Sequence, residues 1–350
     1  MLRDQAMIRM IPLSRRDWCT VALVVLTGVT LGMLAWSPRS SAAGPDQRMS
    51  ATLLGSAGAC GRASGSHPAY RHVIWIWFEN HGYDAVIGSK DAPFTNRLAA
   101  ACGLATNYHN VSPPSLPNYI AATSGSTQGI SDDCQPSECS KNVQSLFGQV
   151  RARGGTWNAY NESMPGACDL EGGSGSNPSG DYAPKHNPAA YYLPLRQACP
   201  LRDVALGTPA SGAFAHALKS DALATFTFIT PNLCNDTHDC PVSTGDAWLA
   251  HWWPAIVSSH AYRAGSVAIF ITWDEGEGGG SDACALNTTD GGCHVGMLVV
   301  SPSTPRGTRS ALLFNHYSLL KTTEQLLGIK TLLGHANDHS SRSMRSAFHL

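Results

Sequence analysis

Four apolar runs dominate the hydrophobic pattern of the chain beyond residue 70, and each ends in polar residues. They are His72–Phe78, Thr225–Thr230, Ser266–Trp273 and Val295–Val300. A short, continuously apolar run is typical of a parallel strand that is buried on both faces. Helical patterns lie between the runs, at Phe94–Ala101, Asn118–Thr123, Val143–Arg153, Ala247–His260 and Tyr317–Leu327. This alternation predicts an α/β fold with a mostly parallel central sheet and helices on both of its faces.

The first 43 residues differ from the rest of the chain. Several arginines precede an uncharged run from Cys19 to Trp36, and the small residues Ser41, Ala42 and Ala43 follow it. This order predicts a secretory signal peptide over residues 1–43, and Arg15 and Arg16 partly match a twin-arginine signal. An uncleaved membrane anchor is the less favoured alternative.

The remaining chain divides by composition. Residues 44–68 are rich in Gly, Ser and Ala and predict a flexible lead-in. The patterned segment, residues 69–335, is expected to form the catalytic domain, and residues 336–350 a C-terminal tail. Residues 163–190 are rich in Gly, Ser, Asn and Pro and predict a long loop or lid.

The net charge bears on the binding partners of the protein, and the cysteine content bears on its disulfides. Without residues 1–43 the net charge falls from −1 to −4, because five arginines and two aspartates are lost. A mildly acidic domain argues against nucleic acid as a partner. Ten of the 11 cysteines follow Cys19, and an even set in an exported protein predicts disulfides.

The spacing of these cysteines favours short-range pairs but does not determine the connectivity. The favoured pairs are Cys134–Cys139, Cys234–Cys240 and Cys284–Cys293, with Cys60–Cys102 and Cys168–Cys199 for the remainder. A zinc–thiolate cluster is the alternative, and the absence of a C-x-x-C pair weakens it.

Acid and amide side chains follow three of the predicted strands. They are Glu79-Asn80, then Asn232 with Asp236 to Asp239, then Asp274-Glu275. In an open α/β sheet, ligands bind at the carboxyl ends of the strands. Oxygen ligands from separate strands suit a divalent cation such as Mg²⁺, Ca²⁺ or Mn²⁺. Helix capping or solvation explains any single pair, but three equivalent pairs favour a metal site.

The segment from Ser112 to Gly125 is the second candidate for chemistry. Pro117 is tolerated in the first turn of a helix, which places Ser115 just before that helix. Helix N–H groups favour an anion there, and a hydroxyl beside a metal can ionise and attack phosphorus. The alternative is an N-cap serine without chemistry.

Five segments, taken together, resemble the bacterial acid phosphatase and phospholipase C phosphoesterase family. They are Glu79-Asn80, Pro114–Tyr119, Asn235–Asp239, Thr272–Glu275 and Asn315–Gly328. The resemblance extends from about His72 to Ile329 and implies an alkaline-phosphatase-like, three-layer α/β/α sandwich. Asn235–Asp239 and Gly245–Leu249 are similar to short exported acid phosphatases, some of which remove the 3-phosphate of phosphatidylinositol 3-phosphate.

The resemblance implies a role for each matched residue. Ser115 would be the nucleophile that forms a phosphoserine. One divalent metal ion (Mg, Ca, Mn or Zn) would be held by Glu79, Asn80, Asp274 and Glu275. Asn118 would bind a phosphate oxygen, and His238 with Asp239 would contact the phosphate or the leaving group.

Several other polar residues have more than one interpretation. His109, Lys185 and His186 are candidates for binding the substrate phosphate. His294 is either a second-metal ligand of the superfamily type or a structural residue. Asp246 is expected to cap its own helix, and His316 and Glu324 to be structural.

The predicted function is an exported, metal-dependent acid phosphatase that hydrolyses phosphate monoesters, with phosphatidylinositol 3-phosphate as a candidate substrate. Membrane contact is expected only through the signal segment or a lipid substrate. A phospholipase C-type phosphodiesterase is the alternative, because the motifs are shared. An alternative of another class is a non-catalytic, disulfide-stabilised exported binding protein. The sequence contains no C/S-x-P-x-R motif, which disfavours a sulfatase.

Overall fold

The computed structural model describes residues 59–61, 70–172, 180–278, 284–286 and 289–350. The predicted signal peptide lies outside these ranges, as does most of the predicted lead-in. Within the described ranges, no helix combines the length and the apolar character that crossing a membrane requires.

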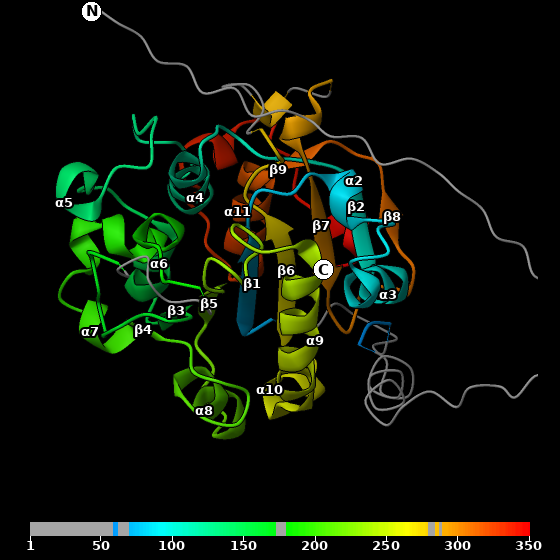
Figure 1. The fold of residues 1–350 in the computed structure, drawn as a ribbon, viewed down its shortest axis with the longest axis horizontal. Coiled ribbons are helices and arrows are strands. Elements are labelled where there is room, and N and C mark those ends of the chain that lie inside the picture. Colours follow the sequence, from blue (N-terminus) through cyan, green and yellow to red (C-terminus); the bar gives the residue numbers. More distant parts are fainter. Residues whose placement is uncertain (1–58, 62–69, 173–179, 279–283, 287–288) are drawn as a thin grey trace, which may run out of the picture. The chain divides into compact units, whose positions relative to one another are not determined.

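A sheet of nine strands forms the centre of the domain, in the order β4-β3-β5-β1-β6-β7-β2-β8, with β9 also paired to β2 (Figure 1). The strands are β1 His72–Phe78, β2 Gly103–His109, β3 Trp157–Asn161, β4 Asp203–Ala205, β5 Phe226–Thr230, β6 Val267–Trp273, β7 His294–Val300, β8 Arg309–Ser310 and β9 Phe314–Asn315. β7 runs antiparallel to β6 and β2, and the other strand pairings are parallel. The prediction of a mostly parallel sheet is confirmed.

The central strands are those that the apolar runs predicted. β1 lies between β5 and β6, with Trp75 paired to Phe228 on one side and Phe270 on the other. Every residue of β6 is buried. Burial on both faces explains why these strands are continuously apolar instead of alternating.

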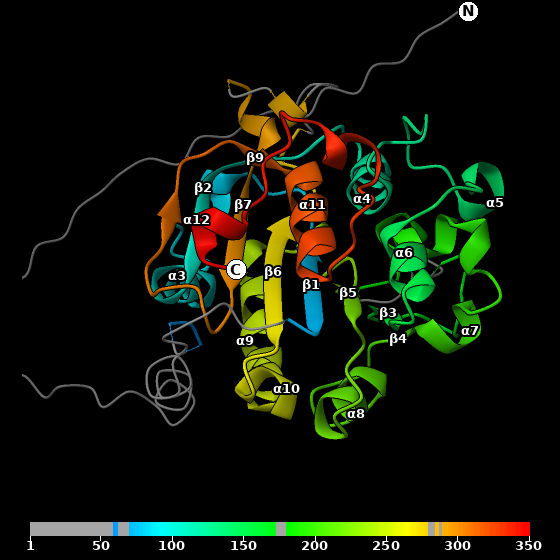
Figure 2. The same cartoon turned by 180° about the vertical axis from the view of Figure 1, so that it is seen from behind.

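Helices cover both faces of the sheet and complete the three-layer α/β/α sandwich (Figures 1 and 2). The helices are α2 Tyr83–Val86, α3 Pro93–Ala101, α4 Ser115–Ser124, α5 Pro136–Cys139, α6 Leu146–Ala152, α7 Cys199–Arg202, α8 Ala213–Lys219, α9 Val242–Ser258, α10 His260–Arg263, α11 His316–Leu326 and α12 Arg345–Phe348. α3, α8, α9 and α10 lie in front of the sheet in Figure 1, whereas α4, α6, α11 and α12 face the viewer in Figure 2.

Disulfides join all ten cysteines of the described residues in the favoured pairs. They are Cys60–Cys102, Cys134–Cys139, Cys168–Cys199, Cys234–Cys240 and Cys284–Cys293. Residues 336–350, set apart by sequence as a tail, also pack against the core. Met344 and Phe348 are fully buried, and the Thr304 hydroxyl donates a hydrogen bond to the Phe348 carbonyl at 2.8 Å.

Candidate active site

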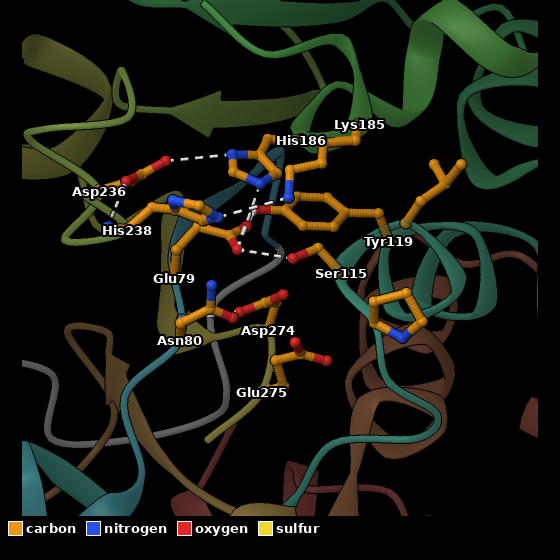
Figure 3. Close-up of polar contacts among 12 residues, drawn as sticks. Glu79, Asn80, Ser115, Tyr119, Lys185, His186, Asp236, His238, Asp274 and Glu275 are labelled. Atoms are coloured by element: carbon orange, nitrogen blue, oxygen red, sulfur yellow. Dashed lines mark hydrogen bonds and ion pairs between the residues drawn. The ribbon is translucent and has the colours of Figure 1, made fainter. Parts of the chain in front are cut away.

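The carboxyl ends of β1, β5 and β6 meet at one edge of the sheet, where Figure 3 shows the acidic residues that follow them. Glu79 and Asn80 follow β1, Asp236 lies in the loop after β5, and Asp274 and Glu275 follow β6. The structure therefore brings together the four predicted metal ligands from two neighbouring strands.

Ser115 lies directly beside this acidic cluster. It is the first residue of α4, with Pro114 at the N-cap, so the helix begins slightly earlier than the sequence suggested. Its hydroxyl donates a hydrogen bond to Glu79 Oε2 at 2.9 Å. The start of a helix favours negative charge, because unpaired N–H groups and the helix dipole point there. The nucleophile candidate is thus next to both a carboxylate and an anion-favouring helix end.

Asn118 connects the loop before Ser115 to Glu275. Its amide oxygen accepts hydrogen bonds from the backbone N–H groups of Val111 at 2.8 Å and Ser112 at 2.9 Å. Its amide nitrogen donates to Glu275 Oε2 at 3.2 Å. Asn118 is fully buried, so its side chain holds this loop against the acidic cluster.

Glu79 is the most densely contacted carboxylate of the cluster. Besides Ser115, it accepts a hydrogen bond from the Tyr119 hydroxyl, and its Oε2 lies 3.3 Å from His186 Nε2. Asp236 contacts the other ring nitrogen of His186 at 3.1 Å. His186 is 2% exposed, and its ring stacks on the Tyr119 ring with centroids 5.6 Å apart, so both of these buried rings contact Glu79 through their polar atoms.

Asn80 and Asp274 supply oxygen atoms without protein partners. The Asn80 backbone N–H donates to Asp274 Oδ1 at 3.1 Å, whereas Asn80 Oδ1 and Asp274 Oδ2 are buried and have no hydrogen bond. Asn80 also adopts a left-handed φ of 50°, which is uncommon for a residue other than glycine. Unpaired buried oxygens are expensive, so these atoms fit the coordination of a cation.

The donor set mixes carboxylate, amide and hydroxyl oxygens. Among the described residues, no three His, Cys, Asp or Glu side chains form a ready metal-binding group by themselves. Asn80 and Ser115 would therefore have to complete the ligands supplied by Glu79, Asp274 and Glu275. Such an oxygen set suits a hard divalent cation.

Burial and mutual repulsion disfavour negative charge on the cluster. Burial raises the pKa of Asp274 to about 6. Burial and the neighbouring Asp274 raise the pKa of Glu275 to about 9. Burial and the charges of Asp274 and Asp236 hold the pKa of Glu79 well above its usual range. A bound cation would favour the charged carboxylates and relieve this repulsion.

Lys185 and His238 face the cluster from the opposite side (Figure 3). Lys185 lies in a 3₁₀ turn, Pro184–His186, within the segment expected to be a loop. Its ammonium nitrogen is 2.9 Å from Asp133 Oδ2 and 3.4 Å from His238 Nε2. His238 Nδ1 lies 2.6 Å from Asp239 Oδ1. The Asp239 side chain is 56% exposed, so it orients His238 rather than entering the cluster.

A surface hollow lies beside the cluster and is open to His238. Its walls include Asn80, Pro114, Thr237, His238 and Glu275. The Asn80 amide, the Glu275 carboxylate and the His238 imidazole therefore line one open cavity, as expected for a site that receives a polar substrate.

His109 and His294 lie together, in paired positions of β2 and β7, with ring centroids 5.4 Å apart. His294 also stacks on Tyr83 at 4.4 Å. His316 is buried under the site and contacts the Asp274 carbonyl at 2.7 Å through Nε2. Asp246 lies inside α9 and accepts the N–H groups of Phe94 and Thr95. The expectation that it caps its own helix was wrong, because it caps the neighbouring α3.

Sequence reasoning missed two residues that shape the site, Tyr119 and Asp133, and it named Asp236 only as one of the polar residues that follow a strand. Tyr119 and Asp236 lie inside the motifs that carried the family resemblance, which was the available signal. Asp133 lies in a loop outside every motif. Its importance follows only from the tertiary contacts with Lys185 and α4.

The fold and the site together define a hydrolase of the alkaline-phosphatase-like type, with a serine at a helix start beside carboxylates. The chain belongs to the phosphoesterase family, whose model matches residues 88–330. It is 30% identical over 279 residues to the phosphatidylinositol-3-phosphatase of Mycobacterium tuberculosis, covering 80% of this chain and 84% of that protein. It is 26% identical to an acid phosphatase of Aspergillus fumigatus, covering 75% of this chain but only 56% of that protein.

Solved structures support the fold assignment. The phosphonate monoester hydrolase of Agrobacterium radiobacter matches with a TM-score of 0.51 and 14% identity, covering 79% of this chain and 77% of that one. Murine ectonucleotide pyrophosphatase/phosphodiesterase 5, in complex with AMP, matches with a TM-score of 0.51 and 11% identity, covering 75% of this chain and 96% of that one. The expected alkaline-phosphatase-like fold is confirmed, and so is the class of enzyme, a hydrolase of phosphate esters.

Proposed function

We propose that this protein is an exported acid phosphatase that hydrolyses phosphate monoesters through a phosphoserine at Ser115. The observation that carries the proposal is the 2.9 Å hydrogen bond from the Ser115 hydroxyl to the buried Glu79 carboxylate at the start of α4. The similarity to a phosphatidylinositol-3-phosphatase supports phosphoinositides as candidate substrates. Five disulfides support an oxidising, extracytoplasmic destination.

One divalent cation would be held by Glu79, Asn80, Asp274, Glu275 and the Ser115 oxygen. When bound, it would supply positive charge for the phosphate and for the ionising hydroxyl. Lys185 would add a second positive charge facing the substrate oxygens.

Glu79 and His238 would carry out the proton transfers of the reaction. As the Ser115 oxygen bonds to phosphorus, its proton passes to Glu79, which already accepts the hydrogen bond from the Ser115 hydroxyl. The ester bond breaks at the same time, and His238 protonates the departing oxygen. Asp239 holds the Nδ1 proton of His238, which leaves Nε2 to exchange protons in the hollow. Water then attacks the phosphoserine and gives its proton to His238. As the bond between the Ser115 oxygen and phosphorus breaks, Glu79 returns its proton to that oxygen, which releases inorganic phosphate and restores the Ser115 hydroxyl.

The test compares p-nitrophenyl phosphate with bis-p-nitrophenyl phosphate from pH 5 to pH 8, with and without EDTA. Ser115→Ala should abolish monoester hydrolysis. Ser124→Ala, at the other end of the same helix, should retain it. Activity that survives in Ser115→Ala would exclude the phosphoserine route. Preference for the diester would move the function to the phospholipase C type, and inactivity of the folded, metal-supplied protein would favour the binding-protein alternative.

A further inference from the structure

We propose that Asp133 is a positioning residue that holds the Lys185 ammonium beside the nucleophile, in place to receive the substrate phosphate. The proposal rests on the proposed function, in which Lys185 contacts that phosphate. Asp133 belongs to none of the motifs that define the family resemblance.

The two carboxylate oxygens of Asp133 make two different contacts. Oδ1 accepts the backbone N–H of Leu116, the residue after the nucleophile, at 3.0 Å. Oδ2 accepts a hydrogen bond from Lys185 Nζ at 2.9 Å. One side chain thus ties the start of α4 to the 3₁₀ turn that carries Lys185. Both side chains are largely sheltered, at 23% exposed for Lys185 and 30% for Asp133.

Asp133 is itself held in place by a short, cross-linked loop. The Cys134–Cys139 disulfide closes the loop directly after it. The Tyr191 hydroxyl donates to the Cys134 carbonyl at 2.8 Å, and Gln135 and Glu138 form a capping box on α5. A carboxylate on so constrained a loop can fix a partner that is flexible.

Lys185 needs such a partner because acidic groups compete for it. Burial alone would lower the pKa of Lys185. The negative charges of Asp133, Glu79 and Asp274 outweigh burial, so the pKa is raised. Lysine has a long, flexible side chain. Without Asp133, the ammonium is free to turn toward Glu79 and Asp274, where it would neutralise the proposed metal ligands instead of facing the substrate.

A purely structural role predicts a different outcome. If Asp133 only caps α4, then any side chain that accepts the Leu116 N–H should replace it. Asp133→Asn keeps a carbonyl oxygen for that N–H but removes the negative charge that holds Lys185. Asp132→Asn is the matched control: it is the same substitution one residue earlier, at an exposed side chain that accepts a hydrogen bond from the nearby Cys134 N–H.

The experiment measures KM and kcat for p-nitrophenyl phosphate and the inhibition constant of inorganic phosphate. The proteins are wild type, Asp132→Asn, Asp133→Asn, Lys185→Gln and the Asp133→Asn/Lys185→Gln double variant. Asp133→Asn should raise KM and the phosphate inhibition constant by about tenfold and leave kcat within about twofold of wild type. The reason is that the lost contact binds the substrate and the transition state equally. In the Lys185→Gln background, Asp133→Asn should have no further effect.

Three results would overturn the proposal. In the first, Asp133→Asn binds phosphate as tightly as wild type or more tightly. In the second, its effect is undiminished in the Lys185→Gln background. In the third, Lys185→Gln leaves both constants unchanged, which also removes Lys185 from the proposed function. The first two leave the phosphatase function intact, whereas an inactive wild-type protein would contradict that function itself.

Discussion

Replacing Asp203 with asparagine should change how stability depends on pH. Asp203 begins β4 and is fully buried. Its carboxyl oxygens accept hydrogen bonds from the Asn161 amide at 2.8 Å and the Asn187 amide at 2.9 Å. Burial raises the pKa of Asp203 to about 7, because neutral amides compensate only part of the lost hydration.

The sign follows from where the proton is bound. The unfolded chain releases the Asp203 proton near pH 3.9, whereas the folded protein keeps it until about pH 7. The contribution of Asp203 to the free energy of unfolding is therefore fully present at low pH and is lost as the pH rises toward 7. The slope is about 1.4 kcal/mol per pH unit and flattens near pH 7, so this contribution falls by about 2 kcal/mol between pH 5 and pH 7.

Urea unfolding of wild type and Asp203→Asn at pH 5, 6, 7 and 8, in EDTA and with disulfides intact, checks this prediction. Asparagine resembles the neutral acid and cannot ionise, so the variant should gain relative to wild type as the pH rises, by about 3 kcal/mol in total. Asp132→Asn, at the surface, should show no such trend. A difference between wild type and Asp203→Asn that stays constant from pH 5 to pH 8 would refute the reasoning.

Three further predictions concern the cap of α3, the Glu79 contacts and the cation. Asp246→Ala removes the acceptor of two N–H groups at the start of α3 and should lower the free energy of unfolding by about 2 kcal/mol, with kcat unchanged. Tyr119→Phe removes a hydroxyl that donates to Glu79 and should reduce kcat/KM about tenfold; unchanged kinetics would show that the contact is dispensable. Dialysis against EDTA should abolish hydrolysis, and titration with Mg²⁺, Ca²⁺, Mn²⁺ or Zn²⁺ should restore it; full activity after chelation would exclude the proposed cation.

Strands buried on both faces were the predictable part of the fold. Apart from His72 at the start of β1 and Thr272 in β6, these two strands have no polar residue, so their pattern is visible without an alignment. β2 and β3 contain Gly, Thr and Asn, and they are defined by pairing with β7 and β5. Such strands are stabilised by tertiary contacts and not by their own apolar pattern, so the sequence did not reveal them.

The residues of the site also differ in whether the sequence could predict them. Glu79 and Asp274 directly follow apolar strands, and Ser115 precedes a proline in a helical turn, so local order in the sequence indicated all three. Asp133 and Tyr119 act through contacts made across the fold, with Lys185 and Glu79. No local pattern distinguishes a surface aspartate from one that holds a lysine.

The order of the disulfides has a consequence for how the protein is made. From Cys60 onward, each cysteine is joined to a neighbouring cysteine in sequence, so no bridge encloses or crosses another. A chain exported unfolded, beginning with its N-terminal end, would present each pair before the next one appears. Oxidation in order of emergence therefore produces the native set without disulfide exchange. Once the whole chain is reduced and unfolded, all these cysteines compete at once, so secretion should give a higher yield of correctly bridged enzyme than refolding.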